Sequence, residues 1–449
     1  MTSIVVGLLA WSAATIVAQR LCWRAPSVGL PIAFLASVAV IHVPGAVVHT
    51  LPWYDRPTLP LVETGFALSA LGAVGLALGQ AWHHRRRRRH GAAPARPHDP
   101  PRSAAVDASS RRAGLRYLVI GLAIHLVVNP LLRGLPTVTA IFSAGMTLSV
   151  CGLQILIHTA WSRGDRVAFR FWLAFTALFP FMTVVSGGYL GYGVSVVVGT
   201  VCFVASFDRP RWRPYVFALV LLYPAMCTYV TYMRDRTEIR AAVWGGAALS
   251  RRFDVVADAL LSPELFDPRD EEHLWRFDER LNQNLLVGQA VRHMERADID
   301  FARGGTILDA LLALIPRAIW PDKPFRAGGS EVVTRYTGQR FDRDTSVGVG
   351  TVLELYINFG AAGLFVGFFA LGVLLSSLDL HCGDLLARGR QGEFVRAYLP
   401  SVSLLASAGN SFVEVGASVV GAFILAVGVR RWVDDPRGGR AQVAPSGRR

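Results

Sequence analysis

The chain has few charged residues. Asp, Glu, Lys and Arg make up 17% of its 449 residues, whereas hydrophobic residues make up 52%. An average soluble domain is about 25% charged. This deficit, together with apolar runs of about twenty residues, excludes an ordinary soluble enzyme, a secreted disulfide scaffold and a disordered chain. The sequence predicts an all-α polytopic membrane protein.

Cysteine and lysine are also scarce. The five cysteines fall in apolar segments or on the face predicted to be cytoplasmic, so no disulfide framework or Cys/His metal site is expected. They are Cys22, Cys151, Cys202, Cys227 and Cys382. Only one of the 46 basic residues, Lys323, is a lysine. Lysine is a compact point charge that suits a phosphate oxygen or a tunable proton carrier.

The apolar segments predict eleven membrane crossings. They cover residues 2–18, 28–49, 61–82, 115–132, 137–158, 168–186, 190–207, 214–233, 350–377, 397–409 and 411–429. A helix needs about 20 residues to span a bilayer. Segment 397–409 is shorter, so it is either a crossing or a re-entrant half-helix.

The distribution of arginine predicts the orientation. One set of loops carries Arg20, Arg24, the run Arg85 to Arg89 and the tail after Arg430, whereas the opposite short loops carry only Arg56 and Arg133. Basic loops face the cytoplasm. We therefore expect a multi-pass protein of the plasma (inner) membrane, with its N-terminus outside and its C-terminus cytoplasmic. The net charge of +14 is then a topology signal and not a nucleic-acid footprint.

The predicted domain organisation follows from these segments. Residues 1–233 hold crossings one to eight, residues 234–350 form a large, mostly helical outer segment, residues 351–432 hold the last three crossings, and residues 433–449 form a cytoplasmic tail. Residues 83–113, rich in Pro, Ala, Ser and Arg, are expected to be a disordered cytoplasmic loop. Its basic run either binds anionic membrane lipid or only sets the topology.

The outer segment carries the candidate chemistry. It holds 17 basic and 19 acidic residues, so its net charge is −2. Arg234 begins it, and Arg236 and Arg240 share a helix face at the outer end of the eighth crossing, where a substrate headgroup would lie. Residues 273–295 are expected to be one helix, with Arg276, Arg280 and Asn284 on one face.

Two further stretches stand out. In Pro316-Arg317-Ala318-Ile319-Trp320-Pro321-Asp322-Lys323-Pro324, prolines stiffen the turn around Asp322 and Lys323, and Trp320 suits a membrane interface. The basic side chains here either bind a substrate or extend to lipid headgroups. Glu354 and Asn358 are four residues apart on one helix face at the outer end of the ninth crossing. No Asp or Glu is expected in mid-membrane, which disfavours a proton-driven carrier.

These stretches resemble the Wzy-type oligosaccharide repeat-unit polymerases, or O-antigen polymerases. The resemblance covers residues 280–380: Gly304-Gly305-Thr306, the proline-bracketed turn, and Glu354-Leu355-Tyr356-Ile357-Asn358-Phe359-Gly360. It implies a GT-C-like helical bundle. It also implies a glycosyltransferase that joins undecaprenyl-pyrophosphate-linked oligosaccharides at the outer face of the cytoplasmic membrane, with the lipid pyrophosphate as leaving group. Lipid-linked oligosaccharides would be its partners, and a chain-length regulator could be another.

The implied reaction assigns roles to the candidate residues. A leaving pyrophosphate needs cationic stabilisation, and Arg317, Lys323, Arg280 and Arg234 are expected to bind it. Glu354 is the first candidate to accept the proton of the attacking hydroxyl, and Asp322 the second. Three further residues are expected to bind sugars, the aromatic ones by stacking. They are Trp320, Tyr356 and Asn358.

No cofactor, metal or nucleic-acid partner is expected. The pairs Asp298/Asp300 and Asp342/Asp344 have the spacing of some metal-binding transferases, but the pattern is short and the segment rich in acids. The alternatives are another lipid-linked glycosyltransferase, a ligase-like enzyme that moves one finished chain, and a transporter of lipid-linked sugars. A transporter would have two related halves and mid-membrane charges, and the sequence has neither.

Overall fold

The described part of the chain is helical. The computed structural model describes residues 2–90, 104–132, 141–208, 212–315, 320, 329–341 and 347–433, and every regular element in these ranges is a helix. Seven helical segments are long and apolar enough to cross a membrane. They are α1 (Thr2–Cys22), α2 (Leu30–Val48), α3 (Leu59–Arg89), the pair α8–α9 (Arg166–Gly187), α10 (Leu190–Phe207), α17 (Gly350–Ala387) and the Phe412–Arg430 part of α19 (Phe412–Val433). These are the features expected of a helical membrane protein.

The other four predicted crossings also fall largely on helices. The elements concerned are α4 (Ala104–Ala123) with a π-helical turn (Ile124–Val128) and α5 (Asn129–Leu131), α7 (Gly145–Ser162), α11 (Trp212–Trp244), and α18 (Gln391–Ser403) with the 3-10 turn Leu404–Ala408. None of the four meets the length and hydropathy expected of a crossing among the described residues. The total of eleven therefore stays a prediction.

The outer segment contains five short helices after the end of α11. They are α12 (Leu249–Leu261), α13 (Glu271–Arg280), α14 (Gln283–Ala297), α15 (Gly305–Ala313) and α16 (Gly329–Thr337). The prediction of one helix over 273–295 was wrong, because the chain leaves the helix at Leu281 and Asn282. The Leu281 carbonyl accepts a hydrogen bond from the Gly45 amide of α2, and the Asn282 side chain donates to Asp278. The Leu281 carbonyl thus bonds α2 in place of an amide of its own helix, and a local side-chain hydrogen bond accompanies the break.

The basic run also differs from the prediction of a disordered loop over 83–113. Helix α3 continues through Arg89, and α4 begins at Ala104, while residues 91–103 lie outside the described ranges. Arginine has a high helix propensity. Four arginines in the last turn of α3 also complement the negative end of the helix dipole. The tail 434–449 is likewise outside the described residues.

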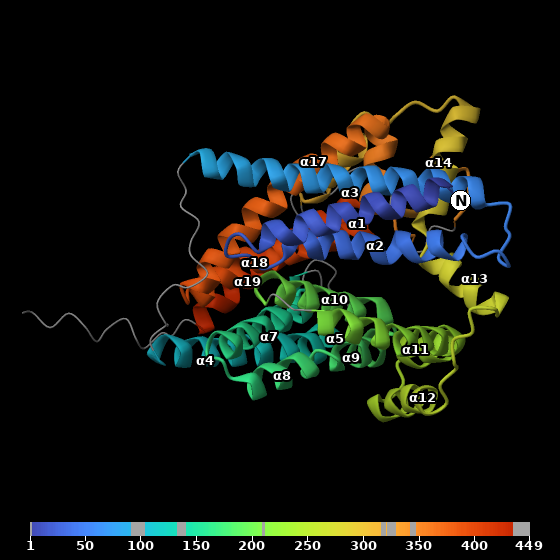
Figure 1. The fold of residues 1–449 in the computed structure, drawn as a ribbon. Helices are drawn as coiled ribbons and strands as arrows, with labels where there is room; N and C mark the ends of the chain where they lie inside the picture. The colour runs from blue at the N-terminus through green and yellow to red at the C-terminus, as the bar shows by residue number, and fades with distance from the viewer. Residues whose placement is uncertain are drawn as a thin grey trace, which may run out of the picture. The chain divides into compact units, whose positions relative to one another are not determined.

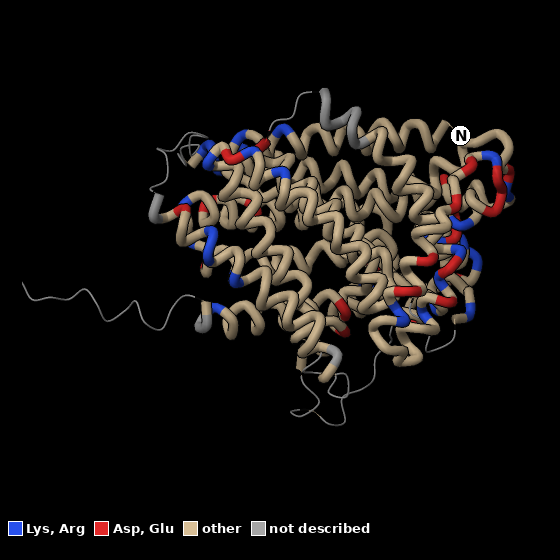
Figure 2. The backbone as a smooth tube through the Cα atoms, turned by 90° about the horizontal axis from the view of Figure 1, so that it is seen from below, with Lys and Arg blue, Asp and Glu red and all other residues tan. Residues whose placement is uncertain are grey.

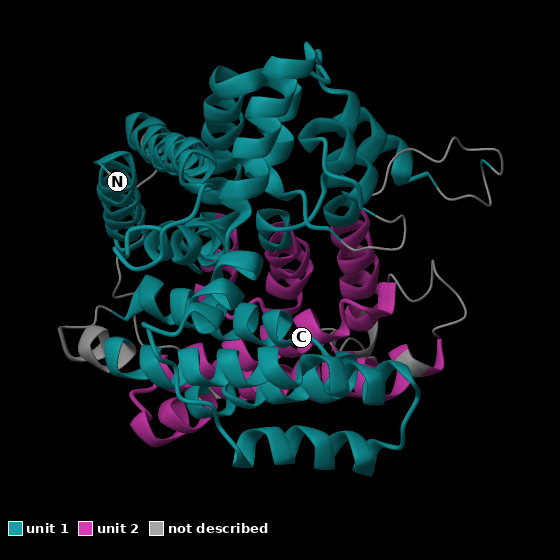
Figure 3. Ribbon diagram, turned by 90° about the vertical axis from the view of Figure 1, so that its right-hand side faces the viewer, with its two compact units in different colours: residues 1–97, 173–380, 405–416 teal, residues 98–172, 381–404, 417–449 magenta. Residues whose placement is uncertain are grey.

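The chain divides into two compact units, coloured in Figure 3. Unit 1 comprises residues 1–97, 173–380 and 405–416, and unit 2 comprises residues 98–172, 381–404 and 417–449. In unit 1, α1, α2 and α3 run side by side (Figure 1). Glycines allow α3 to approach its neighbours closely. A Cβ at Gly79 would collide with the Phe369 carbonyl of α17, and one at Gly65 with the Asn284 carbonyl of α14.

Glycines also allow close helix packing in unit 2. Helices α4 and α7 pack through two pairs of glycines spaced seven residues apart. A Cβ on Gly121 would press on the Ser149 amide, and one on Gly152 would press on the Leu118 amide. Small residues at such crossings let backbones approach and gain dispersion contacts where no hydrophobic driving force acts between helices.

Charges are sparse along the long helices. Figure 2 shows long tan stretches of backbone, with the basic and acidic residues gathered mainly in the shorter segments and at helix ends. Asp379 of α17 is an exception, because it is buried within unit 1. Its Oδ1 accepts hydrogen bonds from the amides of Val28 (3.1 Å) and Leu30 (2.9 Å) at the start of α2. It thereby satisfies donors that a helix start leaves unpaired.

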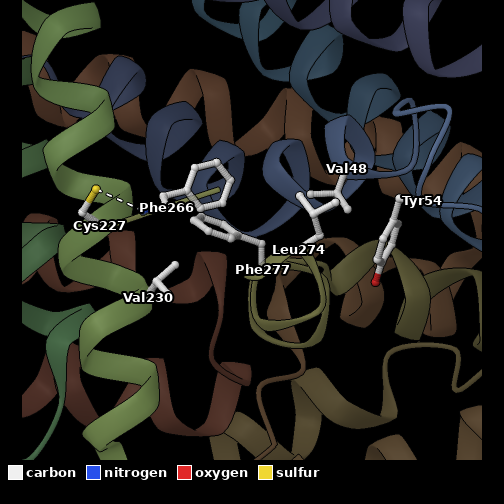
Figure 4. Packing of buried hydrophobic residues seen from close by; sticks show 7 residues of the cluster. All are labelled: Val48, Tyr54, Cys227, Val230, Phe266, Leu274 and Phe277. Atoms are coloured by element: carbon white, nitrogen blue, oxygen red, sulfur yellow. Dashed lines mark hydrogen bonds between the residues drawn. The ribbon is translucent and has the colours of Figure 1, made fainter. Parts of the chain in front are cut away.

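An apolar cluster lies among α2, α11 and α13 in unit 1. It contains Val48, Tyr54, Cys227, Val230, Phe266, Leu274 and Phe277 (Figure 4). The Phe266 and Phe277 rings meet edge to face with centroids 5.4 Å apart, and the Phe266 amide donates to the Cys227 sulfur. Helix α13 and the segment before it are thus fixed against α11 and the end of α2.

Candidate functional site

The kink in α17 organises the first part of the site. Gly360 has φ 67° and ψ −166°, a backbone conformation open essentially to glycine alone. The break frees the carbonyls of Ile357 and Asn358 from the helix. They accept hydrogen bonds from the amides of Ala302 (2.8 Å) and Arg303 (3.1 Å). These two hydrogen bonds therefore hold the loop before α15 against the first part of α17.

Asn358 connects the Gly304-Gly305-Thr306 stretch to the stretch that begins at Glu354. Its side chain is 1% exposed. Its Nδ2 donates to the Thr306 hydroxyl (2.7 Å) and to the Glu354 carbonyl (2.7 Å), and its Oδ1 accepts from the Gly304 amide (2.9 Å). Gly304 has φ 90°, which favours glycine at this turn. The predicted sugar-binding Asn358 is thus fully engaged in holding Gly304-Gly305-Thr306 against α17.

Glu354 lies one turn before Asn358 and is 2% exposed. Its Oε2 accepts a hydrogen bond from the amide of Phe412, the first residue of α19, at 2.7 Å. The Thr306 side chain also hydrogen-bonds this carboxylate. The carboxylate predicted to be catalytic is therefore placed where the motif segments and the start of α19 meet.

A second carboxylate shares this helix start. Glu414 is exposed and accepts from the Ser411 amide (3.1 Å), while the Ser411 hydroxyl accepts from the Glu414 amide (3.4 Å). This reciprocal pattern is a capping box. Glu354 and Glu414 thus bond consecutive backbone amides, and both benefit from the positive end of the α19 dipole.

The predicted sugar-stacking aromatics are placed differently. Tyr356 is half-buried and meets the Phe301 ring edge to face, with centroids 6.1 Å apart. Trp320 is 37% exposed. Arg317, Asp322 and Lys323 lie outside the described residues. Their predicted roles remain untested.

The other two predicted pyrophosphate ligands are described, and both have acidic neighbours. Arg234 binds both Asp235 carboxylate oxygens, at 2.8 and 2.7 Å, and its Nη2 also donates to the Ser262 carbonyl. Arg280 is exposed and pairs with Glu279 at 3.2 Å.

The structure adds Arg236, which sequence reasoning left out of the predicted ligands. Burial lowers the pKa of Arg236, and the nearby charges of Arg280 and Arg240 lower it further. Among the described residues it forms no hydrogen bond or ion pair. The four-residue spacing of Arg236 and Arg240 indicated a shared face, but nothing local indicated that Arg280 would join them. Neighbouring like charges that lower a pKa favour a bound anion, whereas Glu279, which pairs with Arg280, acts on Arg236 in the opposite direction.

Arg240 is fixed by its surroundings. Its guanidinium lies over the rings of Tyr189 (4.9 Å) and Trp244 (5.1 Å), and its Nε donates to the Gly188 carbonyl. Cation–π contacts hold the charge in place without neutralising it. We call Arg236, Arg240 and Arg280 the arginine cluster.

A buried polar network fixes the helix that carries Arg280. The Asp278 carboxylate contacts His49 Nε2 (3.1 Å), the Tyr54 hydroxyl (3.0 Å) and Asn282 Nδ2 (2.5 Å). Burial opposes ionisation of Asp278, but these hydrogen bonds outweigh it and lower the pKa of the carboxyl. Burial is the main cause that raises the pKa of the Tyr54 hydroxyl, and its interaction with the Asp278 carboxylate raises that pKa further.

The network continues to α2. Asn284 donates to Asn282 Oδ1 (2.8 Å) and to the His42 carbonyl (2.6 Å), and its Oδ1 contacts His42 Nδ1 at 2.6 Å. Arg276 is engaged elsewhere, with Glu264 (3.0 Å) and Glu272 (2.6 Å). The predicted shared face of Arg276, Arg280 and Asn284 was therefore wrong, because the break before α14 turns Asn284 into the protein interior.

In the parts of the chain that the structure describes, no three His, Cys, Asp or Glu side chains gather so as to hold a metal ion. Asp298 and Asp300 belong to those parts, whereas Asp342 and Asp344 do not.

No curated protein and no solved structure matches this chain. One family profile, described as a domain of unknown function (DUF8712), matches residues 106–387. This range is more than half of the chain, and it includes both the arginine cluster and Glu354. The chain therefore belongs to the DUF8712 family.

Proposed function

We propose that this protein is a polysaccharide polymerase that joins undecaprenyl-pyrophosphate-linked oligosaccharide repeat units at the outer face of the plasma membrane. In this proposal the chain crosses the membrane eleven times in a GT-C-like bundle, with residues 234–350 outside. The observation that carries it is the arginine cluster: Arg240 and Arg280 act electrostatically on Arg236, which forms no hydrogen bond or ion pair among the described residues, and Glu279, which pairs with Arg280, is the acid that acts on it. A lipid pyrophosphate is an anion of matching charge and location.

The proposed reaction is a glycosyl transfer. The hydroxyl oxygen of the acceptor sugar attacks C1 of the donor sugar, and the bond between C1 and the pyrophosphate oxygen breaks. The electron pair of that bond leaves with the lipid pyrophosphate, whose charge the arginine cluster stabilises. Glu354 accepts the hydroxyl proton. Its hydrogen bond from the Phe412 amide fixes its orientation.

The experiment uses the full chain in proteoliposomes, supplied with lipid-linked oligosaccharide extracted from the host strain that lacks this gene. A polymerase produces a ladder of repeat units, a ligase transfers one finished chain, and a transporter forms no new bond. A ladder supports the proposal. Transport without bond formation would overturn it.

The arginine cluster is tested by Arg236→Ala and Arg280→Ala. Removal of one charged hydrogen-bond donor to a developing anion costs about 10²–10³-fold in turnover. The matched control is Arg251→Ala, since Arg251 is an exposed arginine of the same outer segment that forms no hydrogen bond to a described residue. The control should retain the ladder. Equal turnover in all three variants would remove the arginine cluster from the mechanism.

Glu354 has two roles that can be separated, because it also bonds α19. Glu354→Gln keeps an oxygen that can accept from the Phe412 amide but cannot accept a proton at neutral pH. We expect this variant to fold like the wild type and to lose the ladder. A full ladder from Glu354→Gln would assign Glu354 to helix capping alone.

A further inference from the structure

Three exposed aromatic side chains lie next to Arg240 of the arginine cluster. Tyr189 directly precedes α10, Tyr192 belongs to the first turn of α10, and Trp244 is the last residue of α11. Their exposed fractions are 39%, 62% and 58%, respectively. The Tyr189 ring contacts the other two, with its centroid 5.6 Å from that of Tyr192 and 5.8 Å from that of Trp244. We call these three residues the aromatic platform.

Hydrogen bonds and cation–π contacts hold the aromatic platform in place. Trp244 Nε1 donates to the Gly187 carbonyl (3.2 Å), and Arg240 Nε donates to the Gly188 carbonyl (3.3 Å). The Arg240 guanidinium lies over both the Tyr189 and the Trp244 ring. Gly188 has φ 74°, and a Cβ there would lie 3.2 Å from Arg240 Cγ. The rings are therefore arranged before any ligand binds, which lowers the entropy cost of binding.

The aromatic platform adjoins the arginine cluster. Arg236, Arg240 and Trp244 follow one another at four-residue spacing, so they extend along one face of α11. In the proposed reaction the arginine cluster binds the diphosphate, and the donor sugar is bonded directly to that diphosphate. The first sugar of the donor must therefore lie beside Arg240, where the rings of the aromatic platform are.

A carboxylate also adjoins the aromatic platform. Glu414 lies close enough to Tyr192 for its charge to act on the Tyr192 hydroxyl, and it acts in the same way on Glu354. Glu354 is the residue proposed to accept the proton of the attacking hydroxyl. The reacting carbon of the donor sugar has to be within reach of both the arginine cluster and this hydroxyl. The aromatic platform meets this requirement, because Arg240 contacts it and Glu414 neighbours it.

Exposed aromatic rings suit the chemistry of a sugar. One face of a pyranose ring carries C–H groups, which pack against the slightly negative face of an aromatic ring. Arg240 lies over the Trp244 ring, yet more than half of Trp244 stays exposed. Of the residues predicted from the sequence to bind sugars, Asn358 is buried and Tyr356 is half-buried against Phe301. The aromatic platform therefore offers a sugar more accessible surface than these two residues do.

We propose that the aromatic platform binds the sugars nearest the diphosphate of the lipid-linked donor, which stack on Trp244 and Tyr192. This inference rests on the proposed function, because it names where the sugar part of that substrate binds. Trp244 contacts Arg240 and therefore takes the first sugar. Tyr192 joins the platform through Tyr189 and takes the next sugar.

The test measures binding of two probes to the detergent-purified full chain by native mass spectrometry. One probe is the lipid-linked oligosaccharide extracted from the host strain that lacks this gene, and the other is undecaprenyl diphosphate, which carries no sugar. Tyr192→Ala should raise the Kd of the oligosaccharide probe about five- to tenfold, because roughly 50 Å² of apolar ring surface loses its cover. It should leave the Kd of undecaprenyl diphosphate unchanged. Trp244→Ala should also weaken binding of the oligosaccharide probe more than binding of undecaprenyl diphosphate.

Two further variants complete the test. Tyr192→Phe keeps the ring and should restore tight binding of the oligosaccharide probe. Trp53→Ala is the matched control for Trp244→Ala, because Trp53 is 53% exposed and its Nε1 likewise donates to a backbone carbonyl, that of Pro268, at 2.7 Å. Trp53→Ala should leave both Kd values unchanged.

Equal oligosaccharide Kd values for the wild type, Tyr192→Ala and Trp244→Ala would overturn the inference. Equal weakening of both probes would also overturn it, and would assign the rings to the lipid–water interface, where Trp and Tyr are common. Binding needs no turnover, so the inference and the proposed function can fail separately. A ladder from the wild type together with unchanged binding in the variants contradicts only the inference. Selective loss of oligosaccharide binding in the variants of a protein that forms no ladder contradicts only the polymerase function.

Discussion

The kink at Gly360 provides a sharp test of how the site is assembled. We expect Gly360→Ala to destabilise the protein by two routes. A residue with a Cβ at φ 67° and ψ −166° costs about 1–3 kcal/mol in backbone strain. The added Cβ would also lie 3.3 Å from the Phe301 ring, so that ring must move.

The chain can avoid this strain only by straightening α17. The carbonyls of Ile357 and Asn358 would then return to the helix, and the amides of Ala302 and Arg303 would lose their partners. Each lost backbone hydrogen bond costs about 0.5–1.5 kcal/mol, and more if the amide stays buried. Either route gives a loss of about 1–3 kcal/mol in the free energy of unfolding.

Two measurements on purified protein in detergent check this expectation. Thermal unfolding should show a lower Tm for Gly360→Ala. Hydrogen exchange should show faster exchange at residues 302 and 303 if α17 straightens. Gly199→Ala is the matched control, because Gly199 is a helical glycine of α10 whose added Cβ would meet no atom within 4 Å. Alanine there should keep or raise the Tm. A Gly360→Ala protein with the wild-type Tm and protected amides would refute the role of the kink.

Two further predictions concern buried carboxylates. Asp278 has a lowered pKa in the folded state, so its contribution to stability is present above the unfolded pKa of about 3.9 and is lost as the pH falls through the folded pKa. The difference in Tm between the wild type and Asp278→Asn should therefore be constant near neutral pH and shrink below about pH 4. The control is Asp254→Asn, at an exposed position. A difference in Tm that grows with acidification would contradict this role of Asp278. Asp379→Ala should lower stability by about 1–3 kcal/mol, since two amides at the start of α2 lose their acceptor. Asp379→Asn keeps one oxygen and should lose less, and equal denaturation curves for the Ala variant and the wild type would exclude the cap.

Hydrogen bonds connect Glu354, Thr306 and Asn358 to one another and to α19. The carboxylate is buried and bonded to Phe412, Thr306 is bonded to it, and Asn358 holds Thr306. A substitution at any one of these positions therefore disturbs the other two. Effects of paired substitutions among Glu354, Thr306 and Asn358 should accordingly be non-additive.

The local features of this protein could be predicted from its amino-acid sequence. The length and apolarity of its segments predicted the helices, since about twenty apolar residues form a helix in a membrane whatever their neighbours are. The four-residue spacing of Glu354 and Asn358 placed them on one face, and that of Arg236 and Arg240 did the same. These inferences need only the geometry of a single helix.

Which of these helix faces meet depends on the packing between helices. Glu354 bonds an amide 58 residues away, and Arg280 joins Arg236 from a different helix. The break at Leu281 arises because an amide of α2 takes its carbonyl, which no local pattern near Leu281 indicates. Likewise, the segment after α12 runs along α11 because four side chains of α11 hydrogen-bond its backbone. Helical periodicity fixes the direction of a side chain on its own helix, but packing between helices decides what that side chain contacts, and a single sequence does not record those contacts.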